Sequence, residues 1–247
     1  MIVLTVDQRG STHAEDRVPQ VLDDLAQWSE GGAGLVVPFS RTVGDEVQGV
    51  LVGSDDGARL AVDLTLGLLR DQGWSIGIGV GPVELPLPAE SRNGRGPAFY
   101  RARDAVERAK TRTRGTSVAV EGPDDPTGAN RANEIESLLR LLGAVRARRT
   151  PQGWEAVDVL AGLDDRPGRQ KAAAQALAVS EQAVSQRVRT ALWQEEEAVR
   201  PLAARLLAEL AGLSGPDIGP VGKPAEARGS GTTNDDVRDE LRGTGTP

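Results

Sequence analysis

The chain has 247 residues, of which 38% are hydrophobic, and this is enough for two modest domains with their own cores. A formal net charge of −7 excludes a protein that coats nucleic acid through bulk charge, so any DNA contact requires a local basic face. The chain has no cysteine, which excludes disulfides and thiolate metal sites. Its one histidine, His13, lies in a polar stretch and does not favour a zinc cage or a Ser/His/Asp triad.

The sequence contains no segment that predicts a membrane anchor. Its first six residues, MIVLTV, lack the basic start and the length of a signal peptide, and no apolar run is long enough to span a bilayer. We therefore expect a cytoplasmic protein with no membrane partner.

Residues 1–121 predict an α+β domain. The β-branched run IVLTV at 2–6 indicates a buried strand that ends at Asp7, and Gly44-Asp45 between two apolar runs indicates a hairpin. The remaining elements follow from the period of the apolar residues. Strands are expected at 34–43, 46–53, 74–85 and 116–121, and helices at 18–28, 60–69 and 98–112. The order βαββαβ with an extra helix is typical of ferredoxin-like and palm folds.

A second, all-α domain is expected after a linker. Residues 122–129 are rich in Pro, Gly and Asp, and the periodicity beyond them is purely helical up to residue 213. From Ser214 to Pro247 the chain has few large apolar residues, which predicts a disordered tail. The helices expected in the domain 130–213 are 130–147, 153–162, 168–178, 181–192 and 195–212.

Two carboxylates are candidate metal ligands. In a βαββ sheet the first strand pairs with the third, which begins at Glu46, so Asp7 and Asp45 reach the same edge. Two carboxylates beside a triphosphate can hold Mg²⁺ or Mn²⁺ and leave the other positions to water and phosphate oxygen. Alternatively, Asp7 caps a turn and Asp45 only tolerates a left-handed hairpin position. Glu46, next to Asp45, is expected to face the other side of the strand from Asp45.

Several segments resemble nucleotide cyclases. VDQRGST (6–12) and RTVGDEVQGVL (41–51) resemble the two metal motifs of class III nucleotide cyclases, and SIGIGVGPVE (75–84) resembles the strand that follows them and the SIG strand of GGDEF diguanylate cyclases. FYRARDAVERAKTRTRG (99–115) is similar to the last helix of the GGDEF fold, a resemblance that implies phosphate contacts by Lys110 and Arg114. Basic residues in a last helical turn also interact with the helix dipole without any ligand.

The chain as a whole resembles the SatD family of bacterial proteins, through GDE followed by VQG, a GPAFYRAR segment and a C-terminal helix-turn-helix. It also departs from active cyclases, because Tyr100 and Asp104 occupy the positions of their asparagine and transition-state arginine. On an ideal helix, Arg101 points about 100° away from Tyr100, and Arg103 points about 100° away from Asp104. The resemblance therefore implies a nucleotide-binding domain, with a purine triphosphate preferred, more than it implies catalysis.

The glycines at 77, 79 and 81 allow a close approach of another group to the predicted strand 74–85. Either a nucleotide base or a backbone segment approaches the strand there, or the glycines only relieve crowding in the sheet.

The segment QKAAAQALAVSEQAVSQRV (170–188) matches the spacing of a helix-turn-helix. Small Ala174 stands where the helices cross, Ser180 caps the second helix, and Ala178 stands where glycine is common. Base edges suit the side chains of Gln182, Ser185 and Gln186, and phosphate oxygens suit those of Arg169, Lys171, Arg187 and Arg189. Alternatively, the two helices form a hairpin that packs on the first domain or on a sister subunit.

Three hypotheses about function follow. The first is a DNA-binding regulator whose cyclase-like domain binds a nucleotide with Mg²⁺ or Mn²⁺. The second is a metal-dependent nucleotidyl cyclase or nucleotidyltransferase, and the third is an inactive dimerisation scaffold with a DNA-binding module. The amphipathic segment 195–213 completes the helical domain or pairs two chains, and DNA readers of this type commonly work as homodimers.

Overall fold

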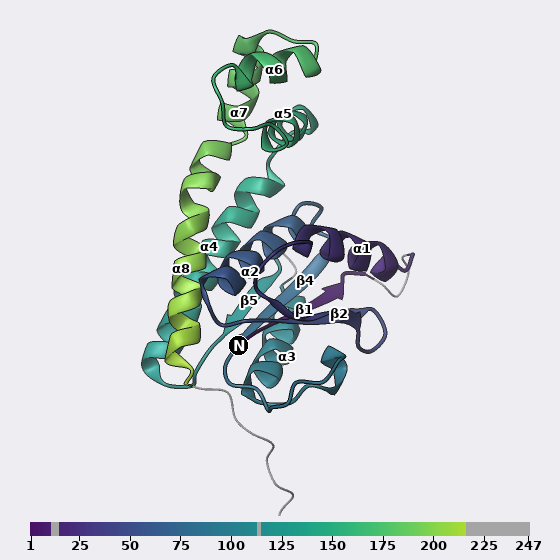
Figure 1. Cartoon of the computed structure of the whole chain (residues 1–247), viewed down its shortest axis with the longest axis vertical. Helices are drawn as coiled ribbons and strands as arrows, with labels where there is room; N and C mark the ends of the chain where they lie inside the picture. Colours follow the sequence, from purple (N-terminus) through teal and green to yellow (C-terminus); the bar gives the residue numbers. More distant parts are fainter. Residues whose placement is uncertain (11–14, 113–114, 216–247) are drawn as a thin grey trace, which may run out of the picture.

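The computed structural model describes residues 1–10, 15–112 and 115–215 (Figure 1). Its N-terminal half is built on a five-stranded mixed sheet in the order β2-β3-β1-β4-β5, in which β4 and β5 are parallel and the other neighbours antiparallel. The strands are β1 (Ile2–Gln8), β2 (Leu35–Arg41), β3 (Glu46–Leu51), β4 (Trp74–Val80) and β5 (Val118–Glu121). The α+β class expected from the sequence is confirmed, and so is the pairing of the first strand with the third.

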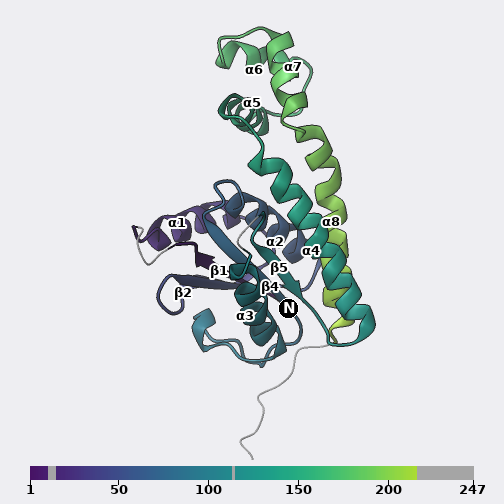
Figure 2. The ribbon, with the colours of Figure 1, turned by 180° about the vertical axis from the view of Figure 1, so that it is seen from behind.

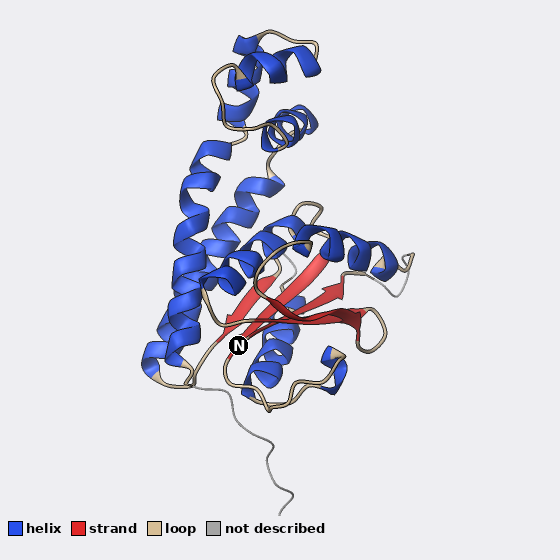
Figure 3. Cartoon of the chain, viewed as in Figure 1, coloured by secondary structure: helices blue, strands red, loops and turns tan. Residues whose placement is uncertain are grey.

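Helices cover both faces of this sheet (Figure 3). The helices α1 (Val18–Ser29) and α2 (Asp55–Leu68) pack on one face, where Ile2, Leu4 and Val6 of β1 join the main hydrophobic core. The helix α3 (Pro97–Lys110) packs on the other face, preceded by a short 3₁₀ turn at Ser91–Asn93. The period-two alternation of β1 thus sends one set of side chains to each helical layer.

The glycines of β4 let α3 approach the sheet closely. A Cβ atom added at Gly79 would lie 2.1 Å from the backbone nitrogen of Ala102, and one added at Gly77 would lie 2.3 Å from that of Val106. Of the two explanations for these glycines, the close approach of a backbone applies, and the backbone is that of α3. A nucleotide base has no room at these two positions.

The long helices α4 (Pro126–Ala147) and α8 (Trp193–Leu213) run side by side along the sheet unit and continue beyond it (Figures 1 and 2). Ile135 and Leu139 of α4, with Leu207 of α8, are buried in the same hydrophobic core as β1 and α2. These two helices therefore share the core of the sheet, although the sequence places them in a separate domain.

The predicted linker 122–129 is partly helical. The Asp125 carboxylate accepts hydrogen bonds from the backbone N–H groups of Thr127 and Gly128, and α4 begins at Pro126. Aspartate at the cap and proline in the first turn are favourable for a helix start, so the composition that suggested a linker marks the beginning of a helix. Only the short stretch between β5 and Asp125 connects the two elements.

Three short helices form a small unit at the far end of α4 and α8, which we call the helical head (Figure 1). They are α5 (Pro151–Ala161), α6 (Arg169–Ala176) and α7 (Glu181–Thr190). The head has its own hydrophobic cluster, distinct from that of the sheet, and its fully or nearly fully buried members are Ala156, Leu160, Ala173, Ala174, Val184 and Val188.

Most predicted elements are present with shifted ends. The helix expected at 60–69 begins earlier, at Asp55, after the cap position Ser54, and the strand expected at 74–85 ends at Val80. The tail expected to be disordered falls largely on residues 216–247, which lie outside the described residues. Over the described parts of the chain, no helix is both long and apolar enough to cross a bilayer.

Candidate functional site

The first candidate site lies at the end of β1. The side chain of Lys110, in the last turn of α3, places Nζ 2.8 Å from Oδ2 of Asp7 and 2.8 Å from Oε1 of Glu107. The Asp7 side chain is only 13% exposed, so this ion pair is sheltered from water. The structure thus brings together two predicted site residues that are 103 positions apart.

The pKa values of this pair are both raised. Burial raises the pKa of the Asp7 carboxyl, and this effect, with the negative charges of Asp45 and Glu46, outweighs the lowering by Lys110. Burial lowers the pKa of the Lys110 amine, but its hydrogen bonds to Asp7 and Glu107 raise it by more. The pKa of the Asp7 carboxyl is therefore raised mainly by its removal from water, in spite of the ammonium group beside it.

Glu46, and not Asp45, is the cross-strand neighbour of Asp7. The register pairs Asp7 with Glu46, and directly opposite residues of an antiparallel pair lie on the same face of the sheet. Glu46, which was expected on the other side of the strand from Asp45, therefore shares a face with Asp7, and Asp45 lies in the hairpin turn before β3, after Gly44 with φ of +61°. Glu46 also accepts a 2.5 Å hydrogen bond from the hydroxyl of Thr42.

A buried polar row continues from this acidic end along the same face. Gln48 donates a 2.9 Å hydrogen bond to the hydroxyl of Thr5, and the hydroxyl of Ser91 donates to the backbone oxygen of Gln48. Thr5, Gln48 and Ser91 were not among the site residues predicted from the sequence. The signal was present in EVQGVL, where Glu46 and Gln48 are polar at alternating positions of an otherwise apolar strand.

A divalent cation fits this site only in part. Among the described residues, no group of three His, Asp or Glu side chains is arranged to hold a metal ion, so the protein alone offers no complete cage. Mg²⁺ is commonly held by one or two carboxylates with water and substrate phosphates. Asp7, with its raised pKa, and Asp45, which raises it further, are the carboxylates that would supply the protein's share.

The other residues suggested by cyclase resemblance lie apart or outside the described chain. Arg114 belongs to the undescribed residues 113–114. Tyr100 is 63% exposed on α3, and Asp104 is exposed on the same helix. Arg101 donates a 2.9 Å hydrogen bond to the backbone oxygen of Val80 and so holds α3 to the end of β4.

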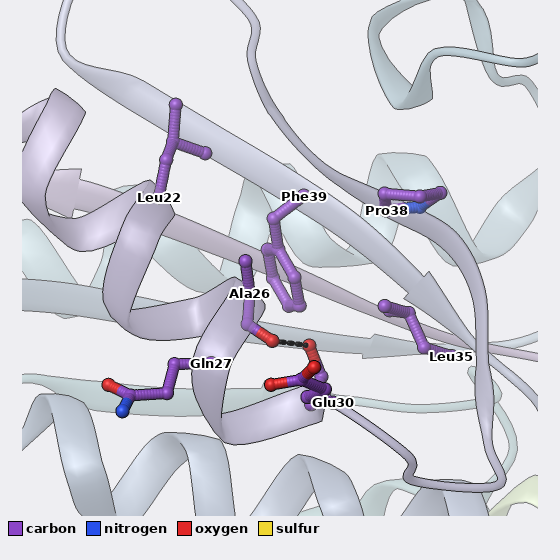
Figure 4. Close-up of a pocket in the computed structure, with 8 residues that line it drawn as sticks. Leu22, Ala26, Gln27, Glu30, Leu35, Pro38 and Phe39 are labelled. Atoms are coloured by element: carbon purple, nitrogen blue, oxygen red, sulfur yellow. Dashed lines mark hydrogen bonds between the residues drawn. The ribbon is translucent and has the colours of Figure 1, made fainter.

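A separate cavity of about 530 Å³ lies between α1 and β2 (Figure 4). Its walls include the apolar side chains of Leu22, Leu35 and Phe39. Among the described residues, Glu30 is the one charged residue in its lining and no basic side chain reaches it, so the cavity does not suit a phosphate group. The acidic end of β1 contributes no residue to it.

The second candidate site is the helix pair α6–α7 of the head. The turn between them has Ala178 in the left-handed conformation, with φ of +52°, and the hydroxyl of Ser180 accepts a hydrogen bond from the backbone N–H of Ala183. Val184 and Val188 face the core of the head and pack with Ala174. The capping and packing roles predicted for these residues are confirmed.

The outward face of α7 is polar. Gln182, Gln186 and Arg189 are exposed, and they recur at the spacing of one helical face. Lys171 of α6 is also exposed. In the part of the chain that the structure describes, neither Lys171 nor Arg189 forms an ion pair, so both cations are available to an external anion.

Three other predicted contact residues are already engaged within the head. Arg169 donates to the backbone oxygen of Leu160 through Nε and Nη2, at 3.1 and 2.6 Å, and its guanidinium lies 5.1 Å from the centroid of the Trp193 ring. Nη1 of Arg187 lies 3.4 Å from Oε2 of Glu155, and the hydroxyl of Ser185 accepts a hydrogen bond from the amide of Gln170. Arg169 therefore has a structural role that its sequence position does not reveal.

A buried ionic cluster joins the head to the long helices. Glu196 at the start of α8 accepts hydrogen bonds from Arg146, at 2.6 Å, and from Arg149, at 2.5 Å. The side chains of Glu196 and Arg149 are each 1% exposed. The guanidinium groups of Arg146 and Arg149 also lie 4.7 and 4.8 Å from the centroid of the Trp154 ring in α5. These contacts hold α5 at the top of α4 and α8.

Comparison of the chain with protein-family models, with curated proteins and with solved structures gave no match in any of the three. The resemblance to the SatD family and to nucleotide cyclases therefore stays a prediction from the motifs alone.

Proposed function

We propose that this protein is a DNA-binding regulator, in which α6 and α7 form a helix-turn-helix and α7 is the recognition helix. The observation that carries the proposal is the exposed face of α7 at the far end of the molecule, with Gln182, Gln186 and Arg189 directed away from the core of the head. A short helix pair with a capped second helix is the form in which such modules enter the major groove.

The charges of this face suit a DNA contact. The chain as a whole carries −7, yet Lys171 and Arg189 are exposed and lack ion-pair partners in the described residues. Cationic side chains contact phosphate oxygens, and glutamine side chains can pair with the exposed edge of adenine. We therefore assign phosphate contacts to Lys171 and Arg189 and base contacts to Gln182 and Gln186. Arg187 can join them by exchanging its Glu155 partner.

DNA binding is tested by fluorescence anisotropy with labelled duplex DNA over a range of salt concentrations. The double variant Lys171→Ala/Arg189→Ala should bind more weakly, and the slope of log affinity against log salt should fall by about 2, because two phosphate contacts are lost. The matched control is Arg95→Ala/Arg103→Ala, which removes two exposed arginines of the sheet unit and should leave the slope unchanged. Equal losses in the two variants would show that only bulk charge matters and would overturn the proposal.

We propose as a second function that the sheet unit is a ferredoxin-like palm domain that binds a nucleotide with Mg²⁺ or Mn²⁺. The strand order β2-β3-β1-β4, with α1 and α2 on one face, supports this assignment. The specific observation in its favour is the half-buried Asp7, whose pKa is raised chiefly by burial and further by the negative charges of Asp45 and Glu46, which a divalent cation would offset. The ammonium group of Lys110 is placed where it can release Asp7 and pair with a phosphate oxygen instead.

Nucleotide binding is tested with purified protein, Mg²⁺ or Mn²⁺, and labelled ATP and GTP. Saturable retention without pyrophosphate release supports a sensor. Release that Asp45→Ala abolishes supports a nucleotidyl cyclase or nucleotidyltransferase. If the protein neither retains a nucleotide nor releases pyrophosphate, the sheet unit is left as a dimerisation scaffold. The DNA proposal would then stand without nucleotide binding.

A further inference from the structure

A second cavity, of about 290 Å³, lies between α1 and the C-terminal end of α2. We call it the junction pocket. One wall is a stripe of α1 with Gln20, Asp24 and Trp28 at intervals of four residues, which places them on one helical face. The facing wall comes from α2, the turn after it and the first residue of β4, and the lining residues on that side are Gly67, Leu68, Arg70, Asp71 and Trp74.

Three of the four tryptophans of the chain lie in or beside this pocket. Only 3% of all residues are aromatic, and the chain has four tryptophans. Two of them, Trp28 and Trp74, line the junction pocket, and Trp154 stacks with the lining residue Arg70 at 4.3 Å from the ring centroid. Such a concentration of tryptophan in an aromatic-poor protein favours a site that recognises a flat or cationic group.

The ring of Trp28 is held in place but not covered. A Cβ atom added at Gly67 would lie 2.7 Å from Cζ3 of Trp28, so the ring rests on the backbone of α2. Nevertheless 43% of Trp28 is exposed. A large aromatic ring that packs on one side and remains open on the other provides a surface for stacking.

Within the described parts of the chain, one carboxylate of the pocket has no cationic partner. Arg17 pairs with Asp71, and Arg70 pairs with Asp158 of α5 through two hydrogen bonds of 2.9 and 2.7 Å. Asp24 is half-buried, and among the described residues its partner is the neutral amide of Gln20, at 2.9 Å. An incoming cation would therefore meet a carboxylate that is hydrogen-bonded to a neutral amide, four residues from the exposed ring of Trp28.

We propose that the junction pocket binds a planar organic cation, which stacks on Trp28 and pairs with Asp24. The volume is close to the lower end of the range for small-molecule sites, about 300 Å³, so it suits a compact ligand of one or two rings. Because Arg70 is both a wall of the pocket and the partner of Asp158, the ligand lies against the contact between the sheet unit and the helical head.

The proposal is tested on the full-length protein by equilibrium dialysis at about 0.15 M salt, which screens the general attraction of an acidic protein for cations. The probes are N-methylquinolinium and 2-naphthoate, which have similar two-ring shapes and opposite charges. We expect one saturable site for N-methylquinolinium and an affinity for 2-naphthoate that is at least about tenfold lower. No saturable binding of the cation, or equal binding of both probes, would overturn the proposal.

Variants of α1 locate the site. Asp24→Asn should lower the affinity for N-methylquinolinium about fivefold. The matched control Asp23→Asn, at an exposed position that does not line the pocket, should leave it within about twofold. Trp28→Leu keeps an apolar contact with Gly67 but removes the ring and should lower the affinity about threefold. A melting curve for each variant gives the folded fraction, and equal affinities for Asp24→Asn and Asp23→Asn would remove Asp24 from the site.

Discussion

Lys110 and Asp7 tie the last turn of α3 to the end of β1 by an ion pair of 2.8 Å. The pair joins the helical layer on one face of the sheet to the strand that lies at its centre. It also places the Lys110 ammonium group between Asp7 and Glu107, while Asp45 and Glu46 add further negative charge around Asp7.

This arrangement predicts how stability depends on pH. The pKa of Asp7 is raised in the folded chain, chiefly by burial, so its ionisation costs folding free energy. The contribution of Asp7 is fully present below its ordinary pKa of 3.8 and is lost as the pH rises through the raised value. Asp7→Asn should therefore unfold at a higher denaturant concentration than the wild type at pH 7, and the difference should vanish toward pH 3. Urea unfolding at several pH values measures this, and a variant that is less stable at pH 7 would contradict it.

The close contact of α3 with β4 predicts a large effect at Gly79. A methyl group there meets the backbone of Ala102 at 2.1 Å, and a helix backbone cannot move aside as a side chain can. We expect Gly79→Ala to destabilise the protein by about 2–3 kcal/mol. The control is Gly212→Ala in α8, where no atom lies within 4 Å of the added carbon and the change should stabilise by up to about 1 kcal/mol. Thermal or urea unfolding distinguishes the two, and similar effects in both would argue against the tight packing.

The buried ionic cluster predicts that Glu196 is essential for stability. Glu196→Gln leaves the guanidinium groups of Arg146 and Arg149 without a negative partner in a buried place, which should cost about 3–5 kcal/mol. The neighbouring change Glu197→Gln removes an exposed ion pair with Arg200 and should cost about 1 kcal/mol or less. Urea unfolding measures both. A loss at Glu196 no larger than that at Glu197 would show that the buried cluster does not hold the structure together.

The turn of the helical head carries removable strain. Ala178 has φ of +52°, a conformation that costs a residue with a Cβ atom about 1 kcal/mol, and glycine adopts it freely. Ala178→Gly should therefore slow hydrogen exchange in α6 and α7 by a factor of about 5. Ala172→Gly, at an exposed position inside α6, should speed that exchange instead, because glycine weakens a helix interior. Faster exchange in Ala178→Gly would contradict the assigned turn.

The local elements of this protein could be predicted from its sequence. The run IVLTV specifies a strand through β-branched residues, and Ser180 before Glu181 specifies a helix start through its hydroxyl. Both signals depend on a residue and its immediate neighbours. The first six elements of the sheet unit, in the order βαββαβ, and the two helices α6 and α7 were therefore predicted correctly. The linker was predicted to run to residue 129, but α4 begins at Pro126. The prediction was wrong there because Asp125 and Pro126 suit both a loop and the start of a helix.

Only the tertiary structure decided which side chains meet. The register of β1 and β3 placed Glu46 opposite Asp7, and the packing of α3 brought Lys110 to the same carboxylate. Packing likewise put α4 and α8 into the core of the sheet. Contacts between distant residues depend on how all the elements pack at once, and neither a local motif nor the hydrophobic period of one element specifies them. The sequence alone therefore determined the kinds of element and the candidate residues, and the fold determined the acidic end, the helical head and the junction pocket.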